Sequence, residues 1–362
     1  MNPQEQVCPN PKCCASGKDG KIGVHSRQDK RYRCKVCGRT FTTTLGTAYY
    51  RLKKSHELFT LVVSLLAYGC PVQAIVAAFQ IDERTVWRWL NQAGKQCETV
   101  HEQLVSKGCL ELGQIQADEL KVKTYLGTIW LAIVMQVKTR LWLGGSVDKQ
   151  RGKALLKRVL SYAERSGIGG EVLIAVDGFN IYLEVIPLIF AKSWDWLHGC
   201  WHGWQEVLIV QLMKQRRGKR GRVEQQIAAG RRQQVAALIR HSQGHGWINT
   251  AYIERLNATF RLRIASLVRC TRVLVRQPET LEVWMWLVGC TYNFCTEHDA
   301  LKIALPISSR KRFWIGRTPA MAAELTDHRW SMAELLAFKR PSIGWSLSRL
   351  TQGAFPLPRP LA

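Results

Sequence analysis

Three acidic residues are the clearest candidates for chemistry in this chain. Asp118 lies in the segment IQADELKVK, Asp177 follows the apolar run VLIAV, and Glu254 lies in NTAYIERLNATFRLR. The rest of the chain is strongly basic, with 52 Lys and Arg residues against 27 Asp and Glu residues and a formal net charge of +25. Such a charge favours a polyanionic partner, and a divalent metal ion offsets the repulsion between carboxylates and phosphates. We therefore expect these acids to hold metal ions that act on a nucleic-acid backbone.

Cysteine spacing near the amino terminus predicts a metal site of another kind. Twelve cysteines are present, and five of them fall within the first 37 residues. Cys8 and either Cys13 or Cys14, followed by Cys34 and Cys37, have the spacing of two thiolate knuckles that close a tetrahedral zinc site. A group of reduced, buried thiols is the weaker interpretation, because a segment of about 40 residues forms no stable core without a cross-link or a metal. We expect structural Zn²⁺ bound by Cys8, Cys13, Cys34 and Cys37.

The next segment is predicted to be a helix-turn-helix. HELFTLVVSLLAYG, PVQAIVAAFQI and DERTVWRWLNQAGK each have apolar residues at helical spacing, and Pro71 and Asp82 stand where helices would begin. In this motif the second helix enters the major groove of DNA. The candidate DNA-facing residues are Glu83, Arg84, Thr85, Arg88 and Asn91. The alternative is an all-helical packing unit whose polar face is only solvated.

After Leu110 the periodicity becomes that of strands. GQIQADELKVK, TIWLAIVMQVKTR and LWLGGSVDK predict three consecutive strands, KALLKRVLSYAERSG predicts an amphipathic helix, and the apolar run 172–176 predicts a strand buried on both faces. These elements imply a mixed sheet flanked by helices, with Asp177 at the carboxyl end of the buried strand. Asp118 lies in the first strand, which can neighbour that strand. Two alternatives remain: Glu119 can be the inward-facing acid, and Asp177 can simply cap a turn.

Glu254 is expected in the first turn of a helix. Asn249 or Thr250 can cap this helix, and Glu254 and Arg261 fall beside its apolar stripe. The stripe consists of Ile253, Leu256, Phe260, Ile264 and Leu267. The helix macrodipole favours a carboxylate at this position without any catalysis, which is the alternative interpretation of Glu254.

The order of these motifs resembles the DDE transposases of bacterial insertion sequences. Thiolate knuckles, a helix-turn-helix, ADE in a first strand, AVDGFNIY at a strand end and NTAYIERLNATFR on a helix follow one another over residues 8–300. Glu254, Arg255 and Asn257 form the most specific motif, and YNFCTEHDAL and RTPAMAAEL are similar to the tail of integrase-type cores. The resemblance is to the insertion-sequence-one type, and it implies an RNase H-like catalytic core.

The resemblance also implies an active site, cofactors and partners. The metal-binding catalytic acids would be Asp118, Asp177 and Glu254, holding two Mg²⁺ ions that Mn²⁺ can replace. Asn257 and Arg261, on the helix of Glu254, would contact DNA. The implied reaction is cleavage at the ends of a mobile element, followed by transfer of the freed 3′-hydroxyl into target DNA. The implied partners are double-stranded DNA, as terminal inverted repeats and as target, and at least a second copy of the chain, because two ends must be handled together.

Four parts of the chain are expected from these patterns. Residues 1–48 form a zinc ribbon, 52–106 an all-α helix-turn-helix, 110–300 an α/β RNase H-like core, and 301–362 a carboxyl-terminal tail. The long stretch between Asp177 and Glu254 predicts an insertion at about residues 191–247, before the last catalytic helix.

The insertion contains the basic run MKQRRGKRGRVEQQ, for which we expect a solvated loop that grips DNA phosphates. Its candidates for DNA contact are Arg216, Arg217, Lys219 and Arg220. Four tryptophans precede the run, and a small core is favoured for them over stacking on unpaired bases. They are Trp194, Trp196, Trp201 and Trp204.

Other classes of function account for less of the sequence. A non-catalytic regulator would use the zinc and helical modules but has no use for the acids, whereas a stand-alone metal-dependent nuclease would use both. A tyrosine recombinase and a paired-histidine nickase are disfavoured because no H-x-x-R or H-x-H sequence occurs. The longest apolar runs are shorter than the roughly 20 residues of a membrane helix, and no secretory signal is recognised. We therefore expect no membrane partner and a bacterial cytoplasmic, nucleoid-associated protein.

Overall fold

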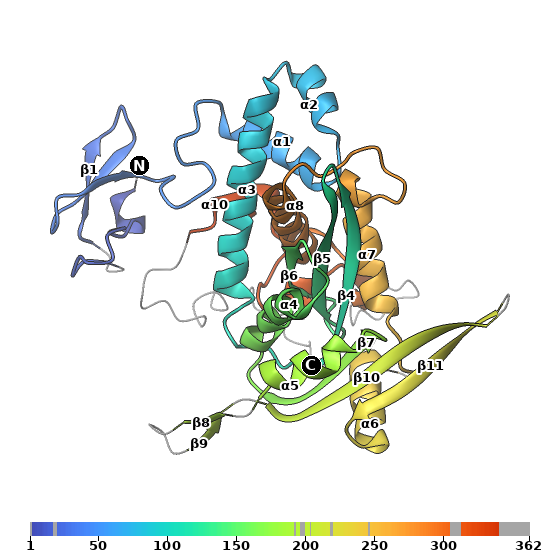
Figure 1. Ribbon diagram of the computed structural model, residues 1–362. Helices are drawn as coiled ribbons and strands as arrows, with labels where there is room; N and C mark the ends of the chain where they lie inside the picture. The colour runs from blue at the N-terminus through green and yellow to red at the C-terminus, as the bar shows by residue number, and fades with distance from the viewer. Residues whose placement is uncertain are drawn as a thin grey trace.

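The computed structural model describes residues 2–16, 20–191, 193–195, 200–202, 204–217, 220–244, 247–304 and 313–339. These residues form a mixed α/β structure with a small amino-terminal module at its side (Figure 1). In this part of the chain, every helix is too short or too polar to cross a lipid bilayer.

The amino-terminal module is a small antiparallel sheet. It consists of η1 (Pro3–Glu5), β1 (Ile22–Ser26), β2 (Arg31–Cys34) and β3 (Thr40–Thr42), with the strands in the order β1-β2-β3. Tyr32 and Phe41 stack in its interior with ring centroids 5.9 Å apart. This interior is a separate hydrophobic cluster that includes Cys8, Cys13 and Cys34. A core this small needs a further source of stability, and the thiols are placed to provide one through a metal.

A helical module follows, made of α1 (His56–Ala67), α2 (Val72–Phe79) and α3 (Glu83–Leu104). The Ser55 side chain caps α1 by accepting from the backbone of Leu58, and Asp82 caps α3 by accepting from that of Arg84. Between α2 and α3 the chain turns through Gln80, whose φ of 51° is in the left-handed region. The two helices expected across a tight turn are therefore present, and α3 continues well beyond the predicted motif.

The central sheet is mixed, as the sequence predicts. Among the described residues its six strands have the order β11-β10-β7-β4-β5-β6. They are β4 (Gly113–Thr124), β5 (Gly127–Gln136), β6 (Trp142–Asp148), β7 (Gly170–Asp177), β10 (Trp204–Arg217) and β11 (Arg220–Ala229). β4, β5 and β6 are antiparallel neighbours, whereas β7 runs parallel to both β4 and β10.

Helices cover both faces of this sheet. They are α4 (Lys153–Ser166), α5 (Ile181–Ile189), α6 (Arg232–Gln243), α7 (Ala251–Arg263) and α8 (Pro278–Cys290), with η2 (Ala265–Leu267) after α7 and the π-helical turn η3 (Thr291–Cys295) after α8. At Gly144 of β6 an added Cβ would meet Tyr162 of α4, and at Gly145 it would meet Met285 of α8. Because successive residues of a strand face opposite sides, α4 and α8 lie on opposite faces.

The predicted insertion is in part a strand of the central sheet. β10 pairs with β7 from Trp204 opposite Gly170 to Leu212 opposite Asp177, because its apolar residues complete the edge of β7 that would otherwise be unpaired. Trp204 is buried against Phe190, as expected for a core residue. Before it, β8 (Ser193–Asp195) and β9 (Cys200–His202) form a short hairpin that carries Trp194 and Trp201, and Trp196 lies outside the described residues.

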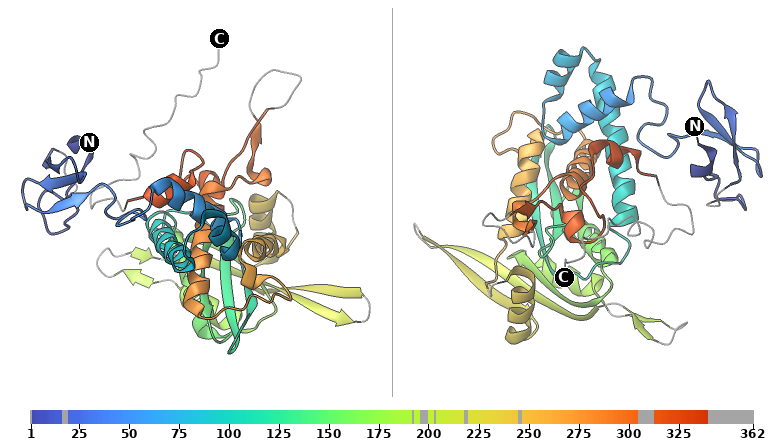
Figure 2. Two further views of the ribbon diagram at one scale, coloured as in Figure 1. Left: turned by 90° about the horizontal axis from the view of Figure 1, so that it is seen from above. Right: turned by 180° about the vertical axis from the view of Figure 1, so that it is seen from behind.

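The basic run is not the solvated loop that we expected. It continues β10 into an antiparallel pair with β11, and this long hairpin projects beyond the rest of the sheet (Figures 1 and 2). The expectation was wrong because a high density of charge does not reveal whether a segment has a strand to pair with. Here β10 and β11 satisfy each other's backbone hydrogen bonds. Arg216, Arg217 and Arg220 lie in these strands, and Lys219 lies outside the described residues.

The predicted carboxyl-terminal tail contains structured elements. They are η4 (Asp299–Leu301), β12 (Ile303–Ala304), β13 (Trp314–Ile315), α9 (Pro319–Ala322) and α10 (Met332–Ala337). A capping box between Ser331 and Glu334 begins α10, and Leu335 and Leu336 are fully buried. The helix packs on α1 and α3. The expectation of only a tail was therefore wrong for α10. Two adjacent leucines in the sequence are not enough to predict a helix that packs in the core.

One hydrophobic cluster joins the helical module to the central sheet, and its buried residues run from Ala48 to Leu336. α3 packs along α8, where the absence of a side chain at Gly94 allows close approach to Val283. Farther along α3, His101 is buried beside Trp142 and Trp286, and its Nε2 lies 2.9 Å from the carbonyl oxygen of Leu143. Burial lowers the pKa of His101 to about 3, so the ring is neutral. The helical module and the sheet thus share one core.

The α3–α8 contact predicts the effect of Gly94→Ala. The added Cβ would lie 2.6 Å from Val283 Cγ1 and 2.7 Å from its carbonyl oxygen, so the helices must move apart. Overpacking of this kind costs about 1–3 kcal/mol, which exceeds the roughly 1 kcal/mol that alanine gains over glycine in a helix. We expect a lower urea midpoint for unfolding. Gly152→Ala is the control, because no atom lies within 4 Å of its added Cβ; equal midpoints for the two variants would contradict the prediction.

Candidate active site

Four cysteines of the amino-terminal module converge. One sulfur each from Cys8, Cys13, Cys34 and Cys37 lies within 4.8 Å of the others, with 3.6 Å between the Cys8 and Cys37 sulfurs. Cys14 is exposed and outside this group, which resolves the choice between Cys13 and Cys14. The backbone N–H of Arg39 lowers the pKa of Cys37 to about 6, which favours its thiolate. Four thiols at this spacing are suited to a tetrahedral metal ion with no open position.

The second group of potential metal ligands begins with two acids on neighbouring parallel strands. β4 and β7 pair from Gly113 opposite Val172 to Gln116 opposite Ala175. Parallel strands advance in step, so this register continued by two residues places Asp118 beside Asp177. The sequence permitted the first strand to lie next to the buried strand but did not require it, and the structure shows that the two strands are neighbours.

Glu119 completes a cluster of three carboxylates. One oxygen each from Asp118, Glu119 and Asp177 lies within 4.8 Å of the others. The side chain of Glu119 is fully buried. Among the described residues, its Oε1 has no hydrogen-bond partner. A buried carboxylate oxygen without a partner is costly, and a cation would satisfy it. Glu119 was the open alternative to Asp118, and both belong to the cluster.

Arg151 connects two of these acids. It lies in the short loop between β6 and α4, and its Nη2 is 2.9 Å from Glu119 Oε2 and 2.9 Å from Asp177 Oδ2. The guanidinium group also stacks 3.9 Å from the centre of the Phe179 ring. Hydrogen bonds to two carboxylates and an aromatic face fix its position. Arg151 therefore holds Asp177 in a defined orientation at the end of β7.

Asn257 performs the corresponding role for Asp118. It lies on α7 and is 1% exposed, and its Nδ2 donates to Asp118 Oδ2 over 2.6 Å. The backbone N–H of Glu119 donates to the other oxygen, Oδ1, over 2.8 Å. We expected Asn257 to contact DNA, but its side chain is buried against an acid. The sequence motif marks a residue that orients the carboxylate from within.

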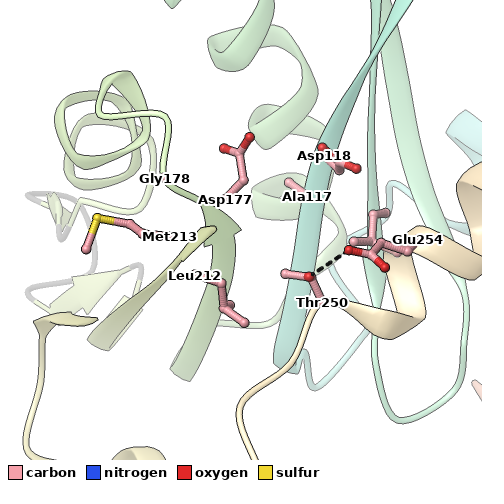
Figure 3. Close-up of a pocket in the computed structure, with 9 residues that line it drawn as sticks. Ala117, Asp118, Asp177, Gly178, Leu212, Met213, Thr250 and Glu254 are labelled. Atoms are coloured by element: carbon pink, nitrogen blue, oxygen red, sulfur yellow. Dashed lines mark hydrogen bonds between the residues drawn. The ribbon is translucent and has the colours of Figure 1, made fainter. Parts of the chain in front are cut away.

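Glu254 lies on the same helix but outside the three-carboxylate cluster. A cavity of about 400 Å³ is lined by Asp118, Asp177 and Glu254 among others. Figure 3 shows Asp177 at the end of β7, Asp118 on β4 and Glu254 on α7, whose Oε1 accepts from Thr250 Oγ1 over 3.3 Å. Gln116 of β4 fixes the start of α7 by accepting from the backbone of Ile253 over 3.0 Å. All three predicted acids therefore face one cavity, with Glu254 at its edge.

The pKa shifts in this site have a common cause. Burial raises the pKa of Asp118, and the negative charges of Asp177 and Glu254 raise it further. Burial also raises the pKa of Glu119, against the opposing charge of Arg151. Burial disfavours charge on Arg151 as well, but Glu119 and Asp177 outweigh it and raise its pKa. Negative charge is thus concentrated in a poorly solvated site, and a divalent cation would reduce the repulsion between the carboxylates.

The candidate DNA-facing residues of α3 lie on an exposed stripe. Arg84, Arg88 and Asn91 are exposed and Thr85 is half-buried, whereas the opposite face buries Val86, Trp89 and Leu90. Glu83 is exposed and accepts from Trp87 Nε1. On α7, Arg261 is half-buried. These groups are open to a partner, in contrast to Asn257.

Sequence reasoning missed Arg151 and Tyr182. Tyr182 of α5 is fully buried beside Glu119, and burial raises its pKa well above the usual value. Neither residue has a spacing signal, because a lone arginine in a loop and a tyrosine in an apolar helix are common in any sequence. Their positions depend on the packing of α4 and α5 on the sheet.

Comparison with known proteins gives one kind of match. No protein-family model and no curated protein matches this chain. Among solved structures, the chain is similar to piggyBac transposase in the cryo-EM structure of its synaptic complex with hairpin DNA. The TM-score is 0.32 and the sequence identity 10%, over 68% of this chain and 69% of that chain.

The cysteine cluster predicts that Cys13 and Cys14 differ in their effect on metal content. Cys13→Ser removes a buried sulfur at 3.9 Å from Cys34 Sγ, so we expect loss of zinc and rapid proteolysis of residues 1–48. Cys14→Ser is the matched control and should retain one zinc ion per chain. Inductively coupled plasma mass spectrometry measures the metal, and equal zinc content in the two variants would overturn the assignment.

The Asn257 hydrogen bond predicts a loss of metal affinity. Asn257→Leu keeps the volume but leaves Asp118 Oδ2 without its donor, and loss of such an orienting bond costs about 10–100-fold in metal affinity. Isothermal titration calorimetry with Mn²⁺ measures the effect. Thr259→Val, on the same helix, removes only a hydrogen bond to the backbone of Arg255 and should bind Mn²⁺ as the unaltered protein does. A folded Asn257→Leu protein with unaltered affinity would exclude this role.

Proposed function

We propose that this chain is a DNA transposase that cleaves and joins strands with divalent metal ions in an RNase H-like core. The observation that supports it is the carboxylate cluster of Asp118, Glu119 and Asp177, two of whose members, Asp118 and Asp177, line a cavity together with Glu254. A regulator that only binds DNA has no use for buried, mutually repelling acids. The net charge of +25 makes a polyanion the natural substrate.

The donor set fits Mg²⁺, with Mn²⁺ as a substitute. Mg²⁺ prefers oxygen ligands, and the close approach of three carboxylates supports a capacity for a cation. Asp118 and Asp177 would hold the ions, with Glu119 or Glu254 beside them. When bound, two such ions would activate water or a DNA 3′-hydroxyl and stabilise the leaving oxygen. At the amino terminus, Cys8, Cys13, Cys34 and Cys37 would hold structural Zn²⁺.

The other side chains position the acids and the DNA. Arg151 orients Asp177 and Asn257 orients Asp118, so both carboxylates are ordered before a metal arrives. The exposed stripe of Arg84, Arg88 and Asn91 on α3 would lie in the major groove and bind the terminal inverted repeats. Arg216, Arg217, Lys219 and Arg220 would contact phosphates of the end or of the target.

The proposed reaction also implies an assembly. Two element ends must be cut and joined to one target, so we propose at least a homodimer on DNA. A bacterial cytoplasmic location, with the protein on the nucleoid, is also part of this proposal.

The carboxylate cluster predicts which variants lose strand transfer. Asp118→Asn and Asp177→Asn each remove a charge that balances metal, so joining of a DNA end with a free 3′-hydroxyl should fall by about 100-fold or more in Mg²⁺. Gel analysis of labelled DNA measures the products. Glu184→Gln is the control, because this exposed acid pairs with Lys153 outside the cluster.

Three results would change the assignment. Cut products without joined products indicate a stand-alone nuclease, and neither product indicates a DNA-binding regulator. Full activity in Asp118→Asn would exclude the cluster as the active site.

A further inference from the structure

The hairpin that joins β4 to β5 ends in two exposed apolar side chains. Tyr125 is 65% exposed and Leu126 is 96% exposed. The hairpin is paired up to Thr124 opposite Gly127, and Thr124 Oγ1 accepts from the backbone of Leu126 over 3.2 Å. The tip is therefore held by backbone pairing on both sides. Tyr125 and Leu126 are thus two adjacent apolar side chains that stay exposed to solvent and do not pack in the core of this chain, which is a feature of interaction sites.

The loop between α7 and α8 lies against this tip. The backbone N–H of Val275 donates to the carbonyl of Lys123, and Val275 pairs with Thr124 as an isolated bridge. Figure 1 shows the loop curving over the end of β4 and β5. Val273, two residues before Val275 in the loop, is 56% exposed, so the loop adds a further exposed apolar side chain to this part of the molecule.

Charge on these two segments is of one sign. Residues 120–128 and 261–277 contain no Asp or Glu. Their exposed cations are Lys121, Lys123, Arg269, Arg272 and Arg276. Among the described residues, none of these cations lies within ion-pair distance of an acidic side chain. We name this set, with Tyr125, Leu126 and Val273, the hairpin-tip surface.

Two arginines of the hairpin-tip surface act electrostatically on α3 and on α7. The pKa of Glu83, at the start of α3, is lowered by the hydrogen bond from Trp87 and also by the charge of Arg276. On α7, the pKa of Arg261 is lowered by burial and by Arg269, and the charge of Asp118 acts on it in the opposite direction. A duplex bound at the start of α3 would therefore also be within reach of the charge of Arg276.

We propose that the hairpin-tip surface binds duplex DNA, with Leu126 inserted between base pairs as an apolar wedge. Cations on β4 and on the adjacent α7–α8 loop would neutralise phosphates, and the apolar side chain at the tip would unstack a base step, as in proteins that kink DNA. A protein partner would need acidic groups to match the cations, whereas DNA supplies phosphates and apolar base faces together. The wedge would present distorted DNA to the carboxylate cluster.

This inference takes DNA as the polyanion from the proposed function, but it does not require catalysis. Binding and unstacking are measured in EDTA, so a failure of strand transfer leaves both measurements interpretable. EDTA is added only after gel filtration, and the zinc content of each sample is confirmed at the end.

The cations are tested by the salt dependence of binding. The probe is a fluorescein-labelled duplex of about 30 base pairs, or three helical turns. Lys121→Gln combined with Lys123→Gln should lower the slope of log K against log salt by about 2, since each phosphate contact contributes about 0.9. Lys107→Gln combined with Lys157→Gln changes two exposed lysines elsewhere and should leave the slope unaltered. Equal slopes in the two double variants would overturn the proposal.

The wedge is tested with 2-aminopurine, whose fluorescence rises when a base is unstacked. The base is placed at flexible TA steps of the same duplex. The unaltered protein should raise the signal, and Leu126→Ser should reduce the rise by at least about 3-fold while affinity changes less than about 10-fold. Ile168→Ser is the control, because Ile168 is 65% exposed in the loop between α4 and β7. No rise with the unaltered protein, or an equal rise with Leu126→Ser, would exclude the wedge.

Discussion

The register of β4 against β7 is the constraint on which the site depends. Gln116 pairs with Ala175, and the two acids follow two residues later on each strand. A shift of one residue would turn Asp118 to the other face of the sheet, because side chains alternate along a strand. The buried residues of β7 and β4 oppose such a shift, since it would expose apolar side chains and bury Lys121. Core packing therefore sets the geometry of the acids.

Acids at this proximity repel one another, and the surrounding structure compensates. Arg151 bridges Glu119 and Asp177, and Asn257 holds Asp118 with one donor. These groups lie on opposite faces of the sheet, as Asp118 and Glu119 do on successive positions of β4. Glu119 Oε1 meets no hydrogen-bond partner at normal distance among the described residues, although the Tyr182 hydroxyl lies close enough to lower the pKa of Glu119.

The sequence reveals those parts of the site whose signal is local. The position of Asp177 could be predicted because a fully apolar run precedes it, and the cysteine cluster because knuckle spacing is specific, although spacing alone left Cys13 and Cys14 as alternatives. Strand β10 and helix α10 could not be predicted, because their apolar residues are recognisable as core residues only once their distant partners, β7 for β10 and α1 and α3 for α10, are known. Arg151 was missed for the same reason: its role arises from the two acids that β4 and β7 bring to it. The burial of Asn257 likewise depends on how α7 packs on β4.

Helix α3 connects the candidate DNA-facing stripe to the sheet without a flexible joint. Its 22 residues span about 33 Å, with Arg84 and Arg88 near one end and the buried His101 near the other. Because α3 packs along α8, which in turn packs on β6, a displacement of the stripe must move the core. A rigid connection of this kind fixes the distance between the stripe and the carboxylates. The hairpin tip is a continuation of β4 itself, so under the proposed DNA binding a distortion at Leu126 would occur at a fixed position relative to Asp118.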